Sequence, residues 1–343
     1  MNSTKNALIT GITGQDGSYL AEFLINKGYN VYGTVRRGAS EKFSRLEFLK
    51  IKDKINFIDF DLLELSNIQK VIRDTEPNEI YNLAAQSFVP TSFSLPILTS
   101  DINALGVTRI LDTILNQNKD IKFYQASTSE MFGKVQSVPQ NENTGFHPRS
   151  PYGVSKLFSH HMTINYRESY DLFACSGILF NHESPLRGYE FVTKKIIRAL
   201  TQIKNGSKQC LYLGNIEAQR DWGHAKDYIE AMWLMLNNDK PDDYVVSTGI
   251  TTTVREFVEL TLNKLNFKYE WTGEGANNSL IDLERNKKII QIDKNLYRPA
   301  EVDILIGDST KIRKNLNWSP NYTLDSLIDD MINFENNNPN LSF

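Results

Sequence analysis

The chain has 343 residues, of which 40% are hydrophobic and 23% are charged. This composition is typical of a soluble globular protein, and the length suits about two domains of roughly 150 residues each. The formal net charge of -3 excludes a strong overall attraction to nucleic acid or to an anionic membrane, so we expect a small-molecule substrate. Two cysteines, a polar beginning and the lack of any apolar run of about 20 residues favour a cytoplasmic protein.

Short apolar runs alternate with helical periodicity through the first half of the chain. Strands are predicted at 7–10, 30–35, 55–60, 79–85, 122–128 and 172–179, and helices at 103–115, 152–170, 192–203 and 224–236. This alternation predicts an α/β fold with a doubly wound parallel sheet of the Rossmann type. We expect this domain to cover residues 1–180 and a smaller, mixed α/β domain to cover 181–343, with segments that can return to the sheet.

A glycine-rich turn follows the first predicted strand and opens the first helix. Its three glycines are spaced Gly-x-x-Gly-x-x-Gly, which lets a backbone approach a pyrophosphate closely and directs helix N-terminal N–H groups at it. The alternative is that the glycines only permit a tight turn. We therefore predict a dinucleotide site that includes Gly11, Thr13, Gly14, Gln15, Asp16 and Gly17.

The end of the second predicted strand indicates which dinucleotide binds. Arg36 and Arg37 stand where an acidic residue would accept the ribose hydroxyls of NAD, and they suit the 2′-phosphate of NADP. The alternative is a solvated basic loop, since Lys42 and Arg45 follow closely. NADP is the predicted cofactor.

Two later strand ends complete the predicted cofactor site. Asp61 and Leu62 could bracket the adenine, although Asp61 could instead cap the following turn. Small residues follow the fourth strand, as expected where a backbone passes a cofactor. The predicted contacts there are Leu83, Ala85, Gln86 and Ser87.

A second cluster of motifs carries the predicted chemistry. Tyr152 and Lys156 are four residues apart on one helix face, so the ammonium can favour the phenolate and make Tyr152 a base. Thr128 would orient a substrate hydroxyl. Glu130 suggests a second proton transfer, which a dehydration needs and a plain alcohol oxidation does not. The alternative for the Tyr and Lys pair is an ordinary amphipathic helix face.

The histidines give less information about the predicted chemistry than these motifs do. His160 and His161 fall within a helix and are expected to pack or to face solvent, whereas His182 lies at the predicted domain junction, where the nicotinamide should lie. No metal-ligand spacing occurs, so no metal is expected.

The whole chain resembles the GDP-mannose 4,6-dehydratases of the extended short-chain dehydrogenase/reductase superfamily. Seven motifs carry the resemblance, at residues 7–20, 124–130, 148–152, 165–169, 177–185, 220–225 and 298–302. It implies an NADP-dependent hydro-lyase that assembles as a homodimer or homotetramer through contacts near the arginine loop. The implied catalytic set is Thr128, Glu130, Tyr152 and Lys156, the further cofactor contacts are His182 and Arg187, and the GDP-sugar contacts are Ser87, Thr128, Glu130, Asn181, Lys195, Arg220 and Arg298.

The sequence departs from the family pattern near the expected sugar pocket. Pro90 and Thr91 stand where small residues are usual, and His147 stands where tyrosine is usual. GDP-mannose is the expected substrate, and a bulkier sugar such as GDP-D-glycero-D-manno-heptose is the alternative. A nucleotide-sugar epimerase or reductase, or a dinucleotide sensor without chemistry, would share the cofactor site, but Glu130 and the intact Thr128, Tyr152 and Lys156 argue against them.

Overall fold

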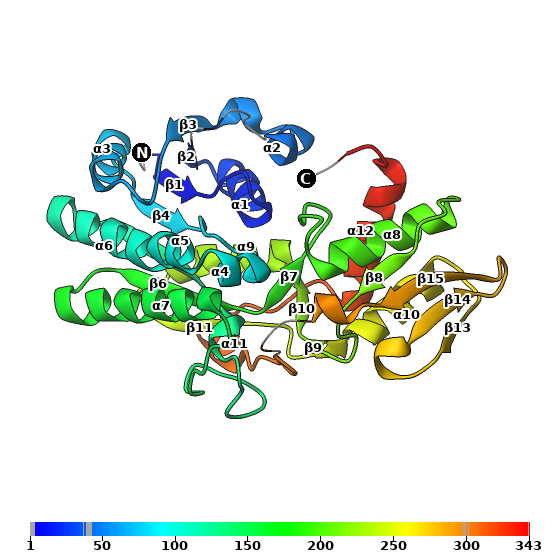
Figure 1. The fold of residues 1–343 in the computed structure, drawn as a ribbon. Coiled ribbons are helices and arrows are strands. Elements are labelled where there is room, and N and C mark those ends of the chain that lie inside the picture. The colour runs from blue at the N-terminus through cyan, green and yellow to red at the C-terminus, as the bar shows by residue number, and fades with distance from the viewer. Residues whose placement is uncertain (1–3, 37, 39–42, 298–299, 301, 342) are drawn as a thin grey trace.

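The structure is a computed structural model of the chain, and it describes residues 4–36, 38, 43–297, 300, 302–341 and 343 (Figure 1). The strands are β1 (Asn6–Thr10), β2 (Asn30–Val35), β3 (Asn56–Asp59), β4 (Glu79–Asn82), β5 (Lys122–Thr128), β6 (Ala174–Leu179), β7 (Asn181–Glu183), β8 (Leu211–Leu213), β9 (Gln219–Arg220), β10 (Trp222–His224), β11 (Asp243–Val246), β12 (Thr252–Thr253), β13 (Tyr269–Thr272), β14 (Ser279–Asp282) and β15 (Lys287–Ile292).

The α-helices are α1 (Gln15–Asn26), α2 (Ser44–Phe48), α3 (Leu65–Thr75), α4 (Val89–Ser94), α5 (Pro96–Ser100), α6 (Gly106–Gln117), α7 (Pro151–Tyr170), α8 (Val192–Lys204), α9 (Ala225–Leu236), α10 (Val254–Lys264), α11 (Thr310–Leu316) and α12 (Leu324–Asn337). Shorter turns are the π-helical η2 (Asp101–Leu105) and the 3-10 helices η1 (Lys52–Lys54), η3 (Ser129–Met131), η4 (Gly275–Asn277) and η5 (Lys294–Leu296).

A seven-stranded sheet forms the centre of the larger unit. Its order is β3-β2-β1-β4-β5-β6-β11, and every neighbouring pair is parallel. The chain winds outward from β1 in both directions, which confirms the predicted doubly wound α/β fold. All six strands predicted in the first half of the chain are present, and three of them, β3, β4 and β6, are shorter than predicted.

Helices cover both faces of this sheet because successive strand residues point to opposite sides. Ile9, Tyr81 and Tyr124 pack in the cluster that includes α1 and α9. Their neighbours Leu8 and Ile80 pack in the opposite cluster, with α3 and α6. Central strands such as β1 and β4 are therefore buried on both faces, as their continuous apolar runs predict, whereas the edge strand β3 is only partly covered.

The second half of the chain builds a smaller layer of mixed structure. The sheet β13-β14-β15-β8 packs with α8, α10 and α12 around a separate apolar core (Figure 1). Strand β11 comes from this half of the chain and adds to the edge of the large sheet beside β6. The division at residue 180 stays a prediction, and β11 is an example of a segment that returns across it.

The candidate functional residues lie beyond the carboxyl ends of β1, β4 and β5, where open parallel sheets bind ligands. Two of the predicted site residues, Arg37 and Arg298, lie outside the described residues. Among the described helices, no apolar segment is long enough to cross a bilayer.

Candidate active site

Two adjoining cavities, of about 420 and 670 Å³, lie along the carboxyl edge of the large sheet. The first contains the predicted catalytic residues, and the second extends toward β2 and β3. They share a wall formed by the glycine turn and the segment after β4, namely Gly11, Thr13, Gly14, Leu83, Ala85 and Ser87. The two cavities thus form one elongated site, with the shape that an extended dinucleotide requires.

The second cavity holds the residues predicted to contact the adenosine end. Arg36, Asp61, Leu62 and Gln86 all line it. Asp61 also accepts a hydrogen bond from the backbone N–H of Leu63 at 3.0 Å, so it caps the turn as well as facing the cavity. The structure shows the turn cap, and the contact of Asp61 with the adenine stays a prediction.

The glycine turn leaves the amino end of α1 open to the cavity. Gly14 is the N-cap of α1, and no side chain caps the helix there. The first N–H groups of a helix have no partner within it, so they can bind a phosphate. A Cβ on Gly17 would lie 2.3 Å from the Gly11 carbonyl oxygen, so only glycine permits this close packing. The turn fits a dinucleotide diphosphate.

The catalytic side chains are brought together by two capped segments. Thr128 ends β5, and its hydroxyl caps η3 by accepting a hydrogen bond from the Glu130 N–H at 3.3 Å. Ser150 caps α7 by accepting from the Gly153 N–H at 3.0 Å. A Cβ on Gly153 would lie 2.9 Å from the Glu130 carbonyl oxygen, so glycine lets the two segments approach. Both elements direct their first turns at the first cavity.

The pKa of Tyr152 is raised in the protein without ligands. Burial raises the pKa of Tyr152 to about 12, and the Glu130 carboxylate also raises it, while a side-chain hydrogen bond with Thr128 acts in the opposite direction. The expectation that Lys156 supplies part of the phenolate stabilisation, with a nicotinamide cation supplying another part, stays a prediction, because burial is the largest influence on this phenol. The loss of hydration outweighs the neighbouring charge.

Lys156 is itself desolvated. Its ammonium donates a hydrogen bond to the Ala126 carbonyl oxygen at 2.9 Å and lies 6.0 Å from the centre of the Tyr152 ring. Burial lowers the pKa of Lys156 to about 8, although the charge of Asp16 raises it. The lysine therefore faces the cavity from a fixed position, on the same side of the helix as Tyr152.

His182 forms a partly buried ion pair with Asp16 of the glycine turn. Its Nε2 lies 2.8 Å from Asp16 Oδ2, and its Nδ1 lies 2.8 Å from the Phe180 carbonyl oxygen. Burial alone would lower the pKa of His182, but Asp16 outweighs it and the pKa is raised. Burial would likewise raise the pKa of Asp16, yet His182 lowers it. Both ring nitrogens lie beside oxygen acceptors, an arrangement that favours the imidazolium form.

The remaining predicted substrate residues lie at different distances from the cavities. Asn181 and Arg187 line the first cavity. Lys195 is exposed on α8, just beyond Phe191, which lines the cavity. Arg220 is buried and donates to the Gln219 and Val302 carbonyl oxygens. Lys195 and Arg220 line neither cavity, and their roles stay predictions.

Three residues of the site were not identified from the sequence. Asn103 lies on the π-helical turn η2 and joins the Gln86 backbone to Ser155 on α7, with hydrogen bonds of 2.8, 3.0 and 3.2 Å. Arg45 and Glu190 line the first cavity. Arg45 therefore does not belong to a merely solvated basic loop, which was the alternative interpretation of this segment. Nothing in the spacing of the three residues indicates a shared site.

Comparison with known sequences identifies the family. The family model for GDP-mannose 4,6 dehydratase matches residues 8–331. Human GDP-mannose 4,6 dehydratase is 49% identical over 334 residues, covering 95% of this chain and 90% of the human protein. The Vibrio cholerae serotype O1 GDP-mannose 4,6-dehydratase is 45% identical over 345 residues, covering 96% and 92%.

Solved structures share the fold at lower identity. A dTDP-glucose 4,6-dehydratase from Bacillus anthracis in complex with NAD has a TM-score of 0.81 and 20% identity, covering 99% of both chains. RMD from Pseudomonas aeruginosa complexed with NADPH has a TM-score of 0.75 and 22% identity, covering 96% of this chain and 97% of the other. These likenesses show that the chain shares its overall fold with these two proteins. Among proteins of this fold, the chain belongs to the GDP-mannose 4,6-dehydratase family.

The pKa of Lys156 has a measurable effect on stability. Between about pH 8 and pH 10.5 the unfolded chain still holds a proton that the folded chain has lost, so this residue makes stability rise with pH. We expect Lys156→Met to remove a rise of up to about 3 kcal/mol across this range. Urea unfolding of both proteins at a series of pH values measures it. Parallel stability profiles would contradict the assignment.

Proposed function

We propose that this protein is an NADP-dependent, redox-neutral 4,6-dehydratase that removes water from a GDP-sugar. GDP-mannose is the first candidate, and the product would be GDP-4-keto-6-deoxymannose. Family membership supports the reaction class, and the neighbours solved with NAD or NADPH support a nicotinamide dinucleotide. The elongated double cavity beside the open end of α1 has the features that such a cofactor needs.

The position of Glu130 is the observation that favours a dehydratase over an epimerase or a reductase. Its carboxylate lines the same cavity as Thr128 and Tyr152 and is close enough to raise the pKa of the Tyr152 phenol. Oxidation or epimerisation at C4 needs a base for one hydroxyl, whereas a dehydration also needs a group for the proton on C5. The site therefore holds one proton-transfer group more than an epimerase or reductase uses.

The proposed mechanism assigns one task to each side chain. A bound nicotinamide ring would take the hydride from C4 and return it to C6, and its positive charge would favour the phenolate. Tyr152 removes the proton of the C4 hydroxyl, Thr128 holds that hydroxyl, and Lys156 anchors the nicotinamide ribose. Glu130 removes the C5 proton and donates it to the C6 hydroxyl as water leaves. No net oxidation results.

The cofactor specificity can be tested at Arg36. Its side chain lines the cavity at the end of β2, and we propose that it pairs with the 2′-phosphate together with Arg37. Arg36→Gln is expected to weaken NADPH binding about tenfold or more, since a charge-assisted hydrogen bond contributes about 1.5–3 kcal/mol. Binding of NADH should not change. Fluorescence titration measures both, with Arg73→Gln on the exposed face of α3 as the control.

Equal affinity of the unaltered protein for NADH and NADPH would contradict the choice of NADP. The nicotinamide dinucleotide class would still stand in that case, because only the 2′-phosphate differs between the two ligands.

The reaction itself can be tested at Glu130. We expect Glu130→Gln to keep the fold and cofactor binding but to lose product formation by roughly 10²–10⁴-fold, the usual contribution of a general acid–base group. Mass spectrometry follows the product, which is lighter than the GDP-sugar by one water. In deuterated solvent, C5 of the product should carry deuterium when the unaltered enzyme acts.

Glu270→Gln, on the exposed side of β13, is the matched control and should react normally. The same assay with GDP-mannose and GDP-D-glycero-D-manno-heptose distinguishes the two candidate sugars. Near-normal dehydration by Glu130→Gln would rule out its role in proton transfer. His182 would then be a poor replacement, because both of its nitrogens are engaged.

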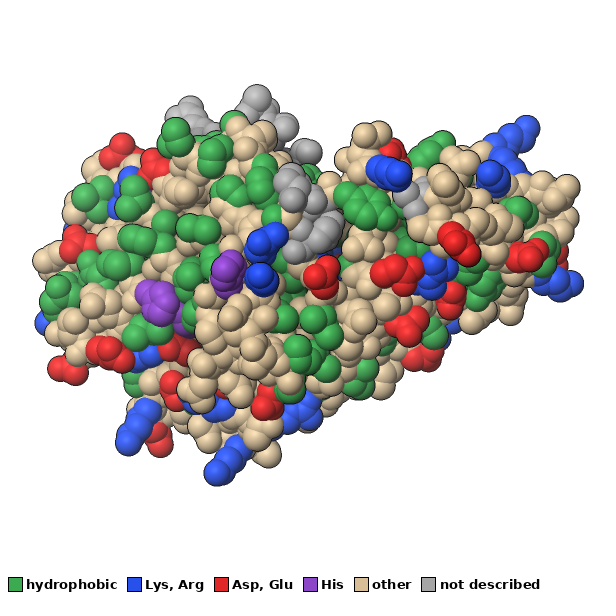
Figure 2. Space-filling view, turned by 60° about the horizontal axis from the view of Figure 1, so that its bottom comes forward, with side chains coloured by type: hydrophobic (Ala, Val, Ile, Leu, Met, Phe, Trp, Pro, Cys, Tyr) green, Lys and Arg blue, Asp and Glu red, His purple; other side chains and the backbone are tan. Residues whose placement is uncertain are grey.

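Exposed apolar side chains on neighbouring helices support a homo-oligomer, either a homodimer or a homotetramer. They lie on α5, η2 and α7, which pack against one another, and include Ile97, Leu105, Val154 and Phe158. Figure 2 shows hydrophobic side chains between the charged ones over the half of the molecule built on the large sheet. Such a surface is more typical of an interface than of a free surface.

Ile97 is the most exposed of these side chains, at 84%. We expect Ile97→Asp to shift the protein toward the monomer, because a carboxylate would lose its hydration in a packed interface. Light scattering at a fixed concentration measures the mass of both proteins. A monomeric unaltered protein would contradict the proposed assembly.

A further inference from the structure

Arg45 is fixed at the wall of the first cavity by the protein backbone. It lies on the short helix α2, after the second strand. Its Nε donates to the Leu186 carbonyl oxygen at 2.7 Å, and its Nη1 donates to the Thr13 carbonyl oxygen at 3.1 Å. Thr13 belongs to the glycine turn, and Leu186 follows β7. The guanidinium thus bridges the two halves of the chain directly beside the predicted diphosphate site.

The charge of this guanidinium is not neutralised by a close carboxylate. Among the described residues, no carboxylate lies within the 4.0 Å of an ion pair, and Nη2 has no hydrogen-bond partner. Glu190 and Asp16 attract the charge from farther away, and Arg187 repels it. An arginine held in this way, with donors remaining, is ready to bind an anion.

We propose that Arg45 binds the diphosphate bridge of the dinucleotide cofactor, opposite the open amino end of α1. Both groups line the same cavity, and they share the glycine turn as their support. The diphosphate carries negative charge that the N–H groups of α1 offset only in part. A fixed guanidinium supplies the remaining positive charge with directed donors.

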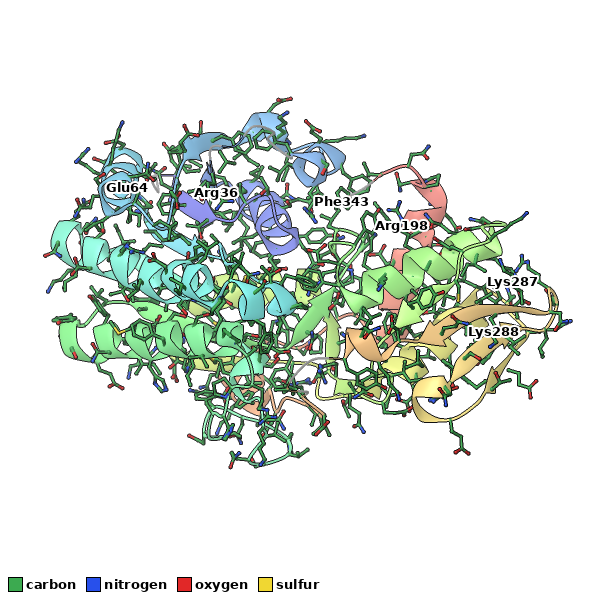
Figure 3. All side chains as sticks on the ribbon, viewed as in Figure 1. Arg36, Glu64, Arg198, Lys287, Lys288 and Phe343 are labelled. Carbon is green, nitrogen blue, oxygen red and sulfur yellow. The ribbon has the colours of Figure 1, made fainter. Side chains whose placement is uncertain are left out.

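An aromatic cluster from the end of the chain holds Arg45 in this position. The ring of Phe343 lies 5.2 Å from the guanidinium carbon and 6.1 Å from the ring of Phe48, one turn along α2. Phe334 of α12 lies 5.2 Å from Phe48 and 5.6 Å from Phe343. Figures 1 and 3 show the end of the chain between α12 and α2. These three phenylalanines are therefore positioning residues for α2.

Two further side chains, Tyr189 and Lys194, connect this terminal segment to the part of the chain around residues 187–191, which lines the first cavity. The Tyr189 hydroxyl donates to the Leu341 carbonyl oxygen. The buried Lys194 ammonium pairs with Glu335 of α12 at 2.6 Å and donates to the Pro185 carbonyl oxygen at 2.8 Å. The aromatic cluster is thereby joined to the segment that carries Leu186 and Arg187.

This inference rests on the proposed dinucleotide cofactor, and ligand fragments test it separately from activity. The probes are NADPH, NADH, 2′-phospho-ADP-ribose, which contains the diphosphate, and adenosine 2′-monophosphate, which lacks it. Arg45→Gln should weaken binding of the three diphosphate ligands at least about tenfold, as expected for a lost charge-assisted hydrogen bond. Binding of adenosine 2′-monophosphate should stay within about twofold, which also shows that the variant is folded.

Two variants of Phe343 test whether its ring positions Arg45. Phe343→Leu removes the ring and should weaken the diphosphate ligands about threefold or more while leaving adenosine 2′-monophosphate unaffected. Phe343→Tyr keeps the ring and should restore normal binding. Arg73→Gln is the control for a removed surface arginine.

The outcomes separate the two proposals. If the unaltered protein binds neither NADPH nor NADH, the proposed function fails. If it binds them and Arg45→Gln binds all four ligands as well as the unaltered protein does, the inference about Arg45 is wrong. Equal weakening of all four ligands also overturns it, because Arg45 would then only support the fold. Equal binding by Phe343→Leu and Phe343→Tyr overturns the positioning role.

Discussion

The partly buried ion pair between Asp16 and His182 is the contact on which the rest of the site depends. Asp16 belongs to the first turn of α1, and His182 to β7, which begins the second half of the chain. Gln15 reinforces it by donating to Asp16 and to the His182 carbonyl oxygen. The pair therefore joins the glycine turn to the second half of the chain.

The electrostatics of the catalytic residues follow from this closed arrangement. Tyr152 and Lys156 are both buried, so each is shifted toward its neutral form, with pKa values of about 12 and about 8. Desolvation thus opposes the charge separation that the reaction needs. Under the proposed function, a positively charged nicotinamide beside the phenol would reverse the balance. The base would then form only when cofactor is in place, which limits unproductive proton transfer.

Local sequence was sufficient for the features that depend on neighbouring residues. The glycine turn and the four-residue spacing of Tyr152 and Lys156 are both short-range, and the structure shows both of them at the first cavity. The parallel sheet could also be predicted from local sequence, because its central strands are buried on both faces and therefore form apolar runs in the sequence. The pKa of Tyr152 could not be predicted from local sequence, since it depends on burial by residues from other segments.

Long-range contacts explain the residues that the sequence did not reveal. Arg45 lies on a helix of five residues and is placed by carbonyl groups and aromatic rings that are up to about 300 positions away in the chain. Asn103 likewise matters because a π-helical turn directs it at Ser155. Neither residue has a local pattern that distinguishes it from solvated neighbours. The end of the chain therefore acts on the first cavity only indirectly, through the contacts of Phe343 with Arg45 and Phe48 on α2.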